Sequence, residues 1–281
     1  MRLNSNIKNS TPFYYFFDAV DHIAKKGWLE GNSGSITALL DKEDIYPYFE
    51  DYFNPTEYKL DIAVPNLSEQ YILVTGKNIP LRNINKFKFK CHRMMGVIKM
   101  NFKGDGYKIL WGFQDGATPT NYLNMHLLSH NNIIERDKKH RILVHCHPTY
   151  LTMKTMTDHT EDEFKFSYEL WDAMPHISNW IPQGIRMVEN TATVEDRTII
   201  SEKFKETDVV VWRKHGIMVA TKSFDDSISY IEIMDKAGNM AMKVQKEPWS
   251  NKPEFFEMQE EVVGIKYNEE VLNAGRKPKH D

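Results

Sequence analysis

The amino-acid sequence predicts a layered α/β domain built around a mixed sheet. Apolar residues recur at helical spacing over 12–28, whereas 71–76 and 141–147 are short apolar runs typical of buried strands. Two further segments, 96–112 and 208–220, have the pattern of hairpins with polar or glycine-rich turns. Because hairpins join antiparallel strands while helices and strands intermix elsewhere, we expect a mixed sheet rather than a purely parallel one.

The remaining elements are less regular. A strand is expected at 36–40, and 41–70, rich in Tyr, Asp, Glu and Pro, has the composition of an irregular insertion. Ser223 and Asp226 resemble a capping box at the start of a long helix. The charged tail from Glu247 onward is expected to pack loosely or to contact another subunit. Further helices are predicted at 120–134, 160–171, 194–205 and 223–245.

The composition is that of a globular protein. The chain has 281 residues, of which 41% are hydrophobic and 27% charged, with a net charge of -3. We expect one domain over 1–281 with a sizeable core, and no nucleic-acid partner, since the charge is nearly balanced. No run of residues is apolar enough to span a membrane or to form a signal peptide. With two cysteines and no disulfide framework, a cytoplasmic location is expected.

Two histidines at the end of a predicted strand are the most informative feature. The run 141–147 ends in His145, Cys146 and His147, and side chains two positions apart on a strand face the same side. Imidazole nitrogens suit zinc and its first-row neighbours. The pair alone is equally consistent with two core histidines, although burying both without partners would cost several kcal/mol.

A third histidine strengthens the metal interpretation. His215 lies at the polar tip of the hairpin predicted at 208–220, followed by Gly216, which can adopt a turn conformation that larger residues resist. Functional sites collect at such sheet ends. Three imidazoles with an open fourth position are typical of catalytic zinc. The sequence therefore predicts a metal site at His145, His147 and His215.

Short motifs along the chain, each weak alone, are specific in their order and spacing. They are Trp-Leu-Glu-Gly-Asn-Ser-Gly-Ser-Ile-Thr at 28–37, Val-Thr-Gly at 74–76, Ile-Leu-Trp-Gly at 109–112, Ala-Thr-Pro-Thr at 117–120, His-Leu-Leu-Ser-His at 126–130, His-Cys-His at 145–147 and Lys-His-Gly at 214–216. Through them the chain resembles the class II aldolase/adducin family over nearly its whole length. The resemblance implies a three-layer α/β/α sandwich around a mainly antiparallel sheet. It also implies a homotetramer with one Zn2+ per subunit, held between subunits by the three histidines.

The resemblance also implies a phosphate pocket made by loop backbone and small polar side chains. Glycine and asparagine at loop tips allow backbone N–H groups to converge on an anion. For 32–35 an ordinary turn is the alternative. The implied phosphate-binding residues are Asn32, Gly34, Ser35, Thr75, Gly76, Lys77 and Asn121.

The chain departs from the family pattern where proton-transfer carboxylates are usual. Tyr122 follows Thr120-Asn121 where the family has Thr-Ser-Glu, and His176 aligns with a second glutamate. One interpretation is that Tyr122 and His176 take over the acid–base work, with Lys77 adding charge to the anion pocket. The other is that the aldol chemistry is lost or altered. Tyr122 would then be a core aromatic at a helix start and His176 a surface residue. His126, four residues before His130, is implied to be structural or to support a ligand.

The resemblance implies an expected function. It is zinc-dependent cleavage of a ketulose 1-phosphate, expected to be L-rhamnulose 1-phosphate, into dihydroxyacetone phosphate and L-lactaldehyde, a lyase reaction of rhamnose catabolism. One alternative is a metal-dependent epimerase or decarboxylase acting on a sugar phosphate or sugar acid. Another is a non-catalytic binding protein, as in the adducin branch.

Overall fold

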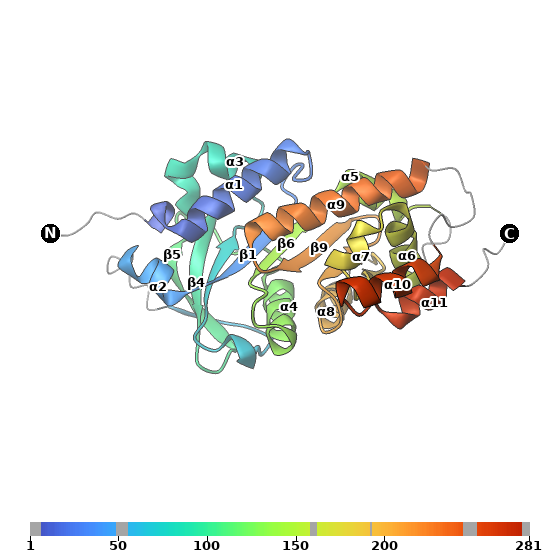
Figure 1. Cartoon of the computed structure of the whole chain (residues 1–281). Coiled ribbons are helices and arrows are strands. Elements are labelled where there is room, and N and C mark those ends of the chain that lie inside the picture. Colours follow the sequence, from blue (N-terminus) through green and yellow to red (C-terminus); the bar gives the residue numbers. More distant parts are fainter. Residues whose placement is uncertain (1–6, 49–55, 158–161, 192, 244–251, 277–281) are drawn as a thin grey trace. The chain divides into compact units, whose positions relative to one another are not determined.

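A computed structural model describes residues 7–48, 56–157, 162–191, 193–243 and 252–276 (Figure 1). Its strands form a nine-stranded sheet in the order β2-β5-β4-β3-β1-β6-β9-β8-β7. The pairings given below are antiparallel except that of β7 with β8. The predicted α/β fold with a mixed, mainly antiparallel sheet is therefore confirmed. No described helix is long and apolar enough to cross a membrane.

The chain divides into two compact units. The first comprises Met1–His147 with Ala220–Ile228, and the second comprises Pro148–Val219 with Ser229–Asp281. The expectation of a single domain over 1–281 stays a prediction. The two units are described separately below.

Strand β1 (Ser35–Leu40) lies between two antiparallel neighbours in the first unit. Thr37 pairs with Val74 of β3 on one side and with Leu143 of β6 on the other. All six residues of β1 are buried, as expected of a central strand. The other strands of this unit are β2 (Glu57–Lys59), β3 (Tyr71–Thr75), β4 (Met95–Met100), β5 (Gly106–Gly112) and β6 (Ile142–Cys146).

Helices cover both faces of these strands. In Figure 1, α1 (Thr11–Lys25) and α3 (Arg82–Lys86) lie on one side, and α4 (Leu123–Arg136) lies on the other. Phe13 of α1 contacts Trp111 of β5 edge to face, with ring centroids 5.3 Å apart. Leu123 and Leu127 of α4 join a buried cluster with apolar residues of β3, β4 and β5. The apolar face predicted for α1 and the buried leucines of α4 thus form the two sides of the core.

The predicted irregular segment 41–70 needs correction. It contains a short helix, α2 (Lys42–Ile45), and the edge strand β2, which pairs with β5. Tyr58 of β2 stacks on Tyr107 of β5 with ring centroids 5.3 Å apart. Such cross-strand aromatic pairs stabilise an exposed edge without an alternating apolar pattern, so the pattern gave no signal. Residues 49–55 of this segment lie outside the described ranges.

The second unit contains a hairpin and helices. Strand β8 (Val209–Trp212) pairs antiparallel with β9 (Gly216–Thr221) and parallel with β7 (Arg186–Val188). The hairpin was predicted, whereas β7 was missed. The helices are α5 (Thr149–Lys154), α6 (Glu163–Ala173), α7 (His176–Trp180), α8 (Val194–Lys203), α9 (Phe224–Lys243, whose first residues belong to the first unit), α10 (Pro253–Val263) and α11 (Glu269–Arg276).

The tail from residue 252 to residue 276 is packed into the core of the second unit. Phe256 of α10 is fully buried and contacts Tyr168 and Trp171 of α6, with ring centroids 5.8 and 5.7 Å away. A Cβ atom at Gly275 would lie 2.2 Å from the Tyr168 ring. The expected loose packing is wrong for this segment, because a few large apolar contacts outweigh its charged composition. Residues 160–161, 244–251 and 277–281, on which other expectations fell, are outside the described ranges.

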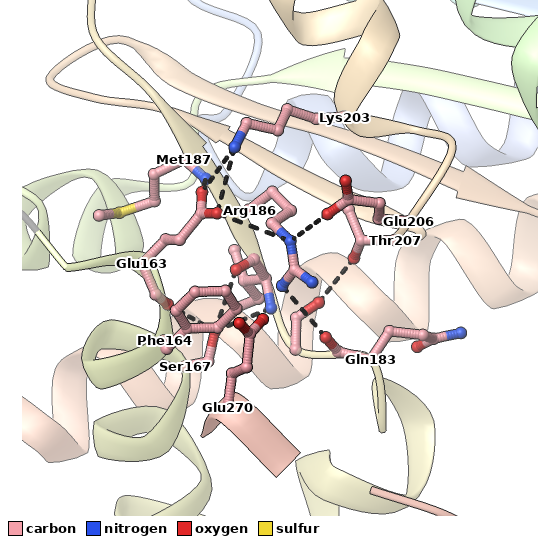
Figure 2. Close-up of polar contacts among 12 residues, drawn as sticks. Glu163, Phe164, Ser167, Gln183, Arg186, Met187, Lys203, Glu206, Thr207 and Glu270 are labelled. Carbon is pink, nitrogen blue, oxygen red and sulfur yellow. Dashed lines mark hydrogen bonds and ion pairs between the residues drawn. The ribbon is translucent and has the colours of Figure 1, made fainter. Parts of the chain in front are cut away.

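A charged network holds β7 to its neighbours in the second unit (Figure 2). Arg186 of β7 is 3% exposed. Its Nε lies 3.0 Å from Oε2 of Glu206 and 3.6 Å from Oε1 of Glu163 on α6. Glu163 also accepts hydrogen bonds from the Met187 backbone N–H at 2.9 Å and from Lys203 of α8 at 3.1 Å. One carboxylate therefore joins α6, α8 and β7.

Replacing Glu163 with glutamine should lower the free energy of unfolding by about 1.5–3 kcal/mol, because charged hydrogen bonds to Lys203 and Arg186 are weakened in a buried setting. The side chain of Glu163 is 19% exposed, whereas that of Glu206 is 61% exposed. Glu206→Gln is the matched control and should change stability by less than about 1 kcal/mol. Urea unfolding of the two variants measures the difference. Equal losses would contradict the central role of Glu163.

Candidate metal and phosphate site

Strand β6 presents the first two histidines. His145 is 1% exposed and pairs across the sheet with Ser35, the first residue of β1. His147 lies one residue beyond the end of β6, and its N–H donates to the Trp28 carbonyl at 3.0 Å. The two imidazole rings have centroids 5.3 Å apart. The spacing therefore brings both rings together, as predicted from their positions two residues apart.

His147 has a carboxylate partner that sequence reasoning did not assign. Its Nδ1 lies 2.5 Å from Oε1 of Glu30, in the loop before β1. Burial acts to raise the pKa of Glu30, but hydrogen bonds from His147 and the backbone outweigh it and hold that pKa below its usual value. Because Nδ1 meets the carboxylate, a metal would bind His147 through Nε2. Carboxylates in this position orient metal-ligating histidines and increase their basicity.

The third histidine lies in the turn between β8 and β9 of the second unit. The His215 N–H donates to the Trp212 carbonyl at 3.0 Å, and its ring lies 4.4 Å from the Trp212 ring, centroid to centroid. The left-handed residue of this turn is Lys214, with φ at +57°, and Gly216 already belongs to β9. The expectation that Gly216 would supply the unusual conformation is therefore wrong. The turn is stabilised by the Lys214 N–H, which donates to Thr155 Oγ1 at 2.9 Å.

Among the described residues, His145, His147 and His215 form a group that could hold a metal ion. His145 and His147 come from the first unit and His215 from the second. Three imidazoles, one of them held by a carboxylate, are a donor set that suits a first-row divalent ion such as zinc. The residues present therefore fit the metal that the sequence led us to expect.

Tyr122 lies beside one of these histidines. It immediately precedes α4, and its ring meets the His145 ring edge to face with centroids 5.3 Å apart. His176 begins α7 in the second unit and is exposed. The Trp180 indole N–H donates to its Nε2 at 2.9 Å. The structure thus places Tyr122 next to a candidate ligand and gives His176 a partner in its own helix. Their catalytic roles stay predictions.

The loop before β1 brings together three of the predicted phosphate-binding residues. Asn32 is exposed, Gly34 has φ at +80°, and Ser35 is buried at the start of β1. A Cβ atom on Gly34 would lie 2.5 Å from the Leu29 side chain and 3.0 Å from the His145 carbonyl oxygen. Glycine is therefore required both by the backbone conformation and by the close approach to β6.

The second predicted phosphate loop uses its backbone groups within the protein. The Gly76 N–H donates to the Met94 carbonyl at 2.8 Å, and the Lys77 N–H donates to the Thr118 carbonyl at 2.9 Å. The Thr75 hydroxyl accepts from the Ile36 N–H at 3.0 Å and donates to the Ile36 carbonyl at 3.3 Å. This loop can still present the exposed side chain of Lys77 to an anion. Asn121, which precedes Tyr122, is exposed as well.

A fully buried polar cluster connects α4 with β1. His126 lies with Nε2 2.7 Å from Ser35 Oγ and with Nδ1 2.8 Å from Thr37 Oγ1. The same Thr37 oxygen lies 2.9 Å from Nε2 of His130. Burial lowers the pKa of His126 to about 3. Burial, and then the charges of His126 and Arg141, hold the pKa of His130 well below its usual value. Both rings are neutral. They support β1 and are not part of the metal group, as the resemblance implied for His126.

The sequence model of a protein family, the class II aldolase and adducin N-terminal domain, matches residues 16–242 of this chain. The protein belongs to the class II aldolase/adducin family, a family of metal-dependent aldolases. The resemblance inferred from the short motifs is confirmed.

Individual relatives of this chain are aldolases of phosphorylated sugars. A rhamnulose-1-phosphate aldolase of Listeria monocytogenes is 32% identical over 223 residues, 78% of this chain and 80% of that protein. A rhamnulose-1-phosphate aldolase of Klebsiella pneumoniae is 31% identical over 225 residues, which are 78% of this chain and 79% of that protein. A sugar-phosphate aldolase structure from Thermotoga maritima shares the fold with a TM-score of 0.68, 24% identity, and coverage of 82% and 92%. The protein is therefore an enzyme, a carbon–carbon lyase of the class II aldolase type.

Alanine at Gly34 should destabilise the protein more than alanine at Gly31. Both residues have positive φ, +80° and +56°, but a Cβ at Gly31 meets nothing within 4 Å. Gly31→Ala should cost about 1–2 kcal/mol for the left-handed backbone. Gly34→Ala should cost about 1–3 kcal/mol more, because the new methyl group overlaps Leu29 and approaches β6. Chemical unfolding of both variants measures this. Equal losses would show that the loop moves freely away from β6.

Glu30→Gln should weaken zinc binding by about 10–100-fold, since loss of the carboxylate removes the partner that orients His147. The measurement is competition for Zn2+ with a chromophoric chelator. Glu43→Gln, an exposed position on α2, removes the same charge from the same unit and should leave the affinity unchanged. Unchanged affinity in Glu30→Gln would mean that the contact does not support the metal site.

Proposed function

We propose that the protein is a zinc-dependent aldolase that cleaves L-rhamnulose 1-phosphate into dihydroxyacetone phosphate and L-lactaldehyde. The observation that carries the proposal is the group of His145, His147 and His215 in a chain that is 31–32% identical to rhamnulose-1-phosphate aldolases. We further propose one zinc ion per subunit of a cytoplasmic homotetramer.

The histidine group would hold the ion and leave a coordination position for substrate oxygen. When bound, a divalent cation supplies Lewis-acid stabilisation of the negative charge that develops at the ketone oxygen during carbon–carbon cleavage. His147 is held in one ring orientation by Glu30, so its Nε2 stays available for coordination.

Proton transfer is assigned to Tyr122 and His176. Contact of Tyr122 with the His145 ring supports its placement near the reacting atoms, where its hydroxyl would give a proton to, or take one from, a sugar oxygen. His176 accepts at Nε2 from Trp180, so in its neutral form the proton is on Nδ1. In this form it would donate a hydrogen bond from Nδ1–H to a substrate oxygen, and it would give up a proton only from the imidazolium form, in which Nε2 no longer accepts from Trp180. Tyr122 and His176 would then perform the work usually given to carboxylates.

The phosphate group of the substrate is assigned to two loops. Asn32, Ser35 and Asn121 would offer neutral donors, and Lys77 would offer a positive charge. Gly34, Thr75 and Gly76 would contribute by shaping the loops, because the Thr75 hydroxyl and the Gly76 N–H already have partners in the protein.

A metal-dependent epimerase or decarboxylase on a sugar phosphate or sugar acid is the second candidate. It is favoured by the replacement of both expected carboxylates, at Tyr122 and His176, which changes the groups available for proton transfer. The third expectation, a non-catalytic binding protein like those of the adducin branch, is disfavoured because relatives that are 31–32% identical to the chain are aldolases.

A retro-aldol assay of the zinc-loaded protein tests the proposal. L-Rhamnulose, L-fuculose and L-ribulose 1-phosphates are supplied in turn, and dihydroxyacetone phosphate is detected by coupled reduction with NADH. We expect release to be fastest from L-rhamnulose 1-phosphate and to stop when the zinc is removed by a chelator. The His145→Ala variant should lose both the bound zinc and the activity. No release from any of the three by a protein that binds zinc would exclude the aldolase and favour the second candidate.

Tyr122→Phe should lower the turnover number by about 10²–10⁴-fold while the bound zinc per subunit stays unchanged, because the variant loses a proton-transferring hydroxyl but no ligand. Tyr58→Phe removes the same hydroxyl from the edge strand β2 and is the matched control, with expected wild-type turnover. A fully active Tyr122→Phe enzyme would leave Tyr122 with only the packing role.

A further inference from the structure

Arg82 connects the turn that contains Glu30 to the segment that follows β3. It is the first residue of α3 and is exposed, and its guanidinium Nη1 donates to the Gly31 carbonyl at 2.7 Å. A hydrogen bond with a charged donor is stronger than one between neutral groups. Gly31 directly follows Glu30, whose carboxylate meets Nδ1 of His147. The guanidinium is therefore attached beside the residue that holds a candidate metal ligand.

The backbone that carries Arg82 is anchored in the core of the first unit. Leu81 and Ile84, on either side of it, are 1% and 0% exposed. The Ile84 N–H donates to the Leu81 carbonyl at 2.9 Å. The Leu81 side chain also approaches the loop before β1, since a Cβ atom at Gly34 would lie 3.4 Å from its Cδ1. An arginine that extends from such an anchored segment can hold the neighbouring loop in place.

The turn at Gly31 has open space around it in the described part of the chain. Gly31 has a left-handed backbone with φ at +56°, and a Cβ atom placed on it would meet nothing within 4 Å. Within the turn, the Ser33 N–H donates to the Glu30 carbonyl at 2.9 Å. Glycine populates many backbone conformations when contacts do not restrict it. The hydrogen bond from Arg82 therefore restricts a residue that side-chain packing does not restrict.

The contact between Glu30 and His147 depends on this restriction. The Glu30 side chain is 60% exposed and the His147 side chain is 14% exposed. An exposed pair of this kind contributes little by itself, because water screens it and holding the side chains in one geometry costs entropy. That cost is smaller when the backbone of one partner is already fixed. Fixing Gly31 thus favours the orientation of Glu30 in which its carboxylate meets the imidazole.

We propose that Arg82 is a positioning residue for the metal site: by binding the Gly31 carbonyl it keeps the Glu30 carboxylate against His147 and so increases the affinity for zinc. This inference rests on the proposed zinc site and adds to it a residue that contacts neither metal nor substrate. Charge alone predicts the opposite effect, because a guanidinium repels a divalent cation. The sign of the change in zinc affinity therefore separates positioning from simple electrostatics.

Zinc affinity is measured by competition with a chromophoric chelator. Arg82→Met removes the guanidinium and should weaken Zn2+ binding about tenfold, because the partner of a ligating histidine is no longer held in place. Arg82→Lys, which keeps a charged donor, should restore part of the affinity. Arg93→Met is the matched control, because Arg93 is an exposed arginine of the same unit that pairs with Asp115, and it should bind zinc as the wild type does. Unchanged or higher zinc affinity in Arg82→Met would overturn the proposal.

A double-mutant cycle tests whether the effect passes through Glu30. In the Glu30→Gln background, Arg82→Met should have no further effect on zinc affinity. An equal loss in both backgrounds would show that Arg82 has a merely structural role and would overturn the positioning proposal. Weaker binding of inorganic phosphate by Arg82→Met, with zinc affinity intact, would overturn it too, because Arg82 would then contact the anion directly.

Hydrogen exchange of the metal-free protein tests the clamp without zinc or substrate. The Glu30 carbonyl protects the Ser33 N–H as long as the turn is closed. Exchange over residues 28–34, followed by mass spectrometry, should be about tenfold faster in Arg82→Met and unchanged in Arg93→Met. A wild-type protein that binds no zinc would overturn the proposed function and this role of Arg82 together. Zinc binding by the wild type with unchanged exchange in Arg82→Met would overturn the role of Arg82 alone.

Discussion

The antiparallel pairing of β1 with both β3 and β6 is the constraint on which the rest of the first unit depends. It sets Ser35 opposite His145 and places the loop that contains Glu30 within reach of His147. A shift of one residue in this register would turn every side chain of β1 to the opposite face. The candidate ligand His145 on β6, the glycine turn before β1 and the buried histidines of α4 would then lose their partners at once. The register of one central strand thus determines how these residues of the candidate site are positioned.

Burial of polar groups explains why this strand can hold only one register. Thr37 is fully buried in the middle of β1, and its hydroxyl lies within hydrogen-bond distance of two imidazoles. A slipped strand would leave these groups without partners in an apolar environment, which costs more than an apolar mismatch of the same size. The cluster therefore adds specificity to a sheet in which many of the buried residues are aliphatic. In the second unit the network around Arg186 also consists of buried polar groups that depend on one another, and it joins three elements.

Much of the fold was predictable because it follows local patterns. The helical stripe of α1, the apolar strands β3 and β6 and both hairpins have clear periodicity, and the three histidines stand out by spacing alone. The missed elements depend on distant partners. Strand β7 is short and contains a buried arginine, which is acceptable only because Glu163 and Glu206 meet it. Glu30 belonged to a recognised motif, but its contact with His147 depends on how β1 and β6 pair. Backbone N–H groups of the loop at Gly76 were expected to face an anion, and only the tertiary structure shows that the N–H groups of Gly76 and Lys77 have carbonyl partners.

The use of those two N–H groups inside the protein has a consequence for recognition in solution. Fixed backbone dipoles hold an anion at short range in a setting that salt screens poorly, whereas an exposed ammonium such as that of Lys77 is a mobile charge in contact with bulk electrolyte. Any anion recruited by this loop would be held by long-range attraction more than by shape. Ionic strength would therefore govern how quickly a phosphorylated sugar is captured, and selection among sugars would depend on the groups deeper in the site.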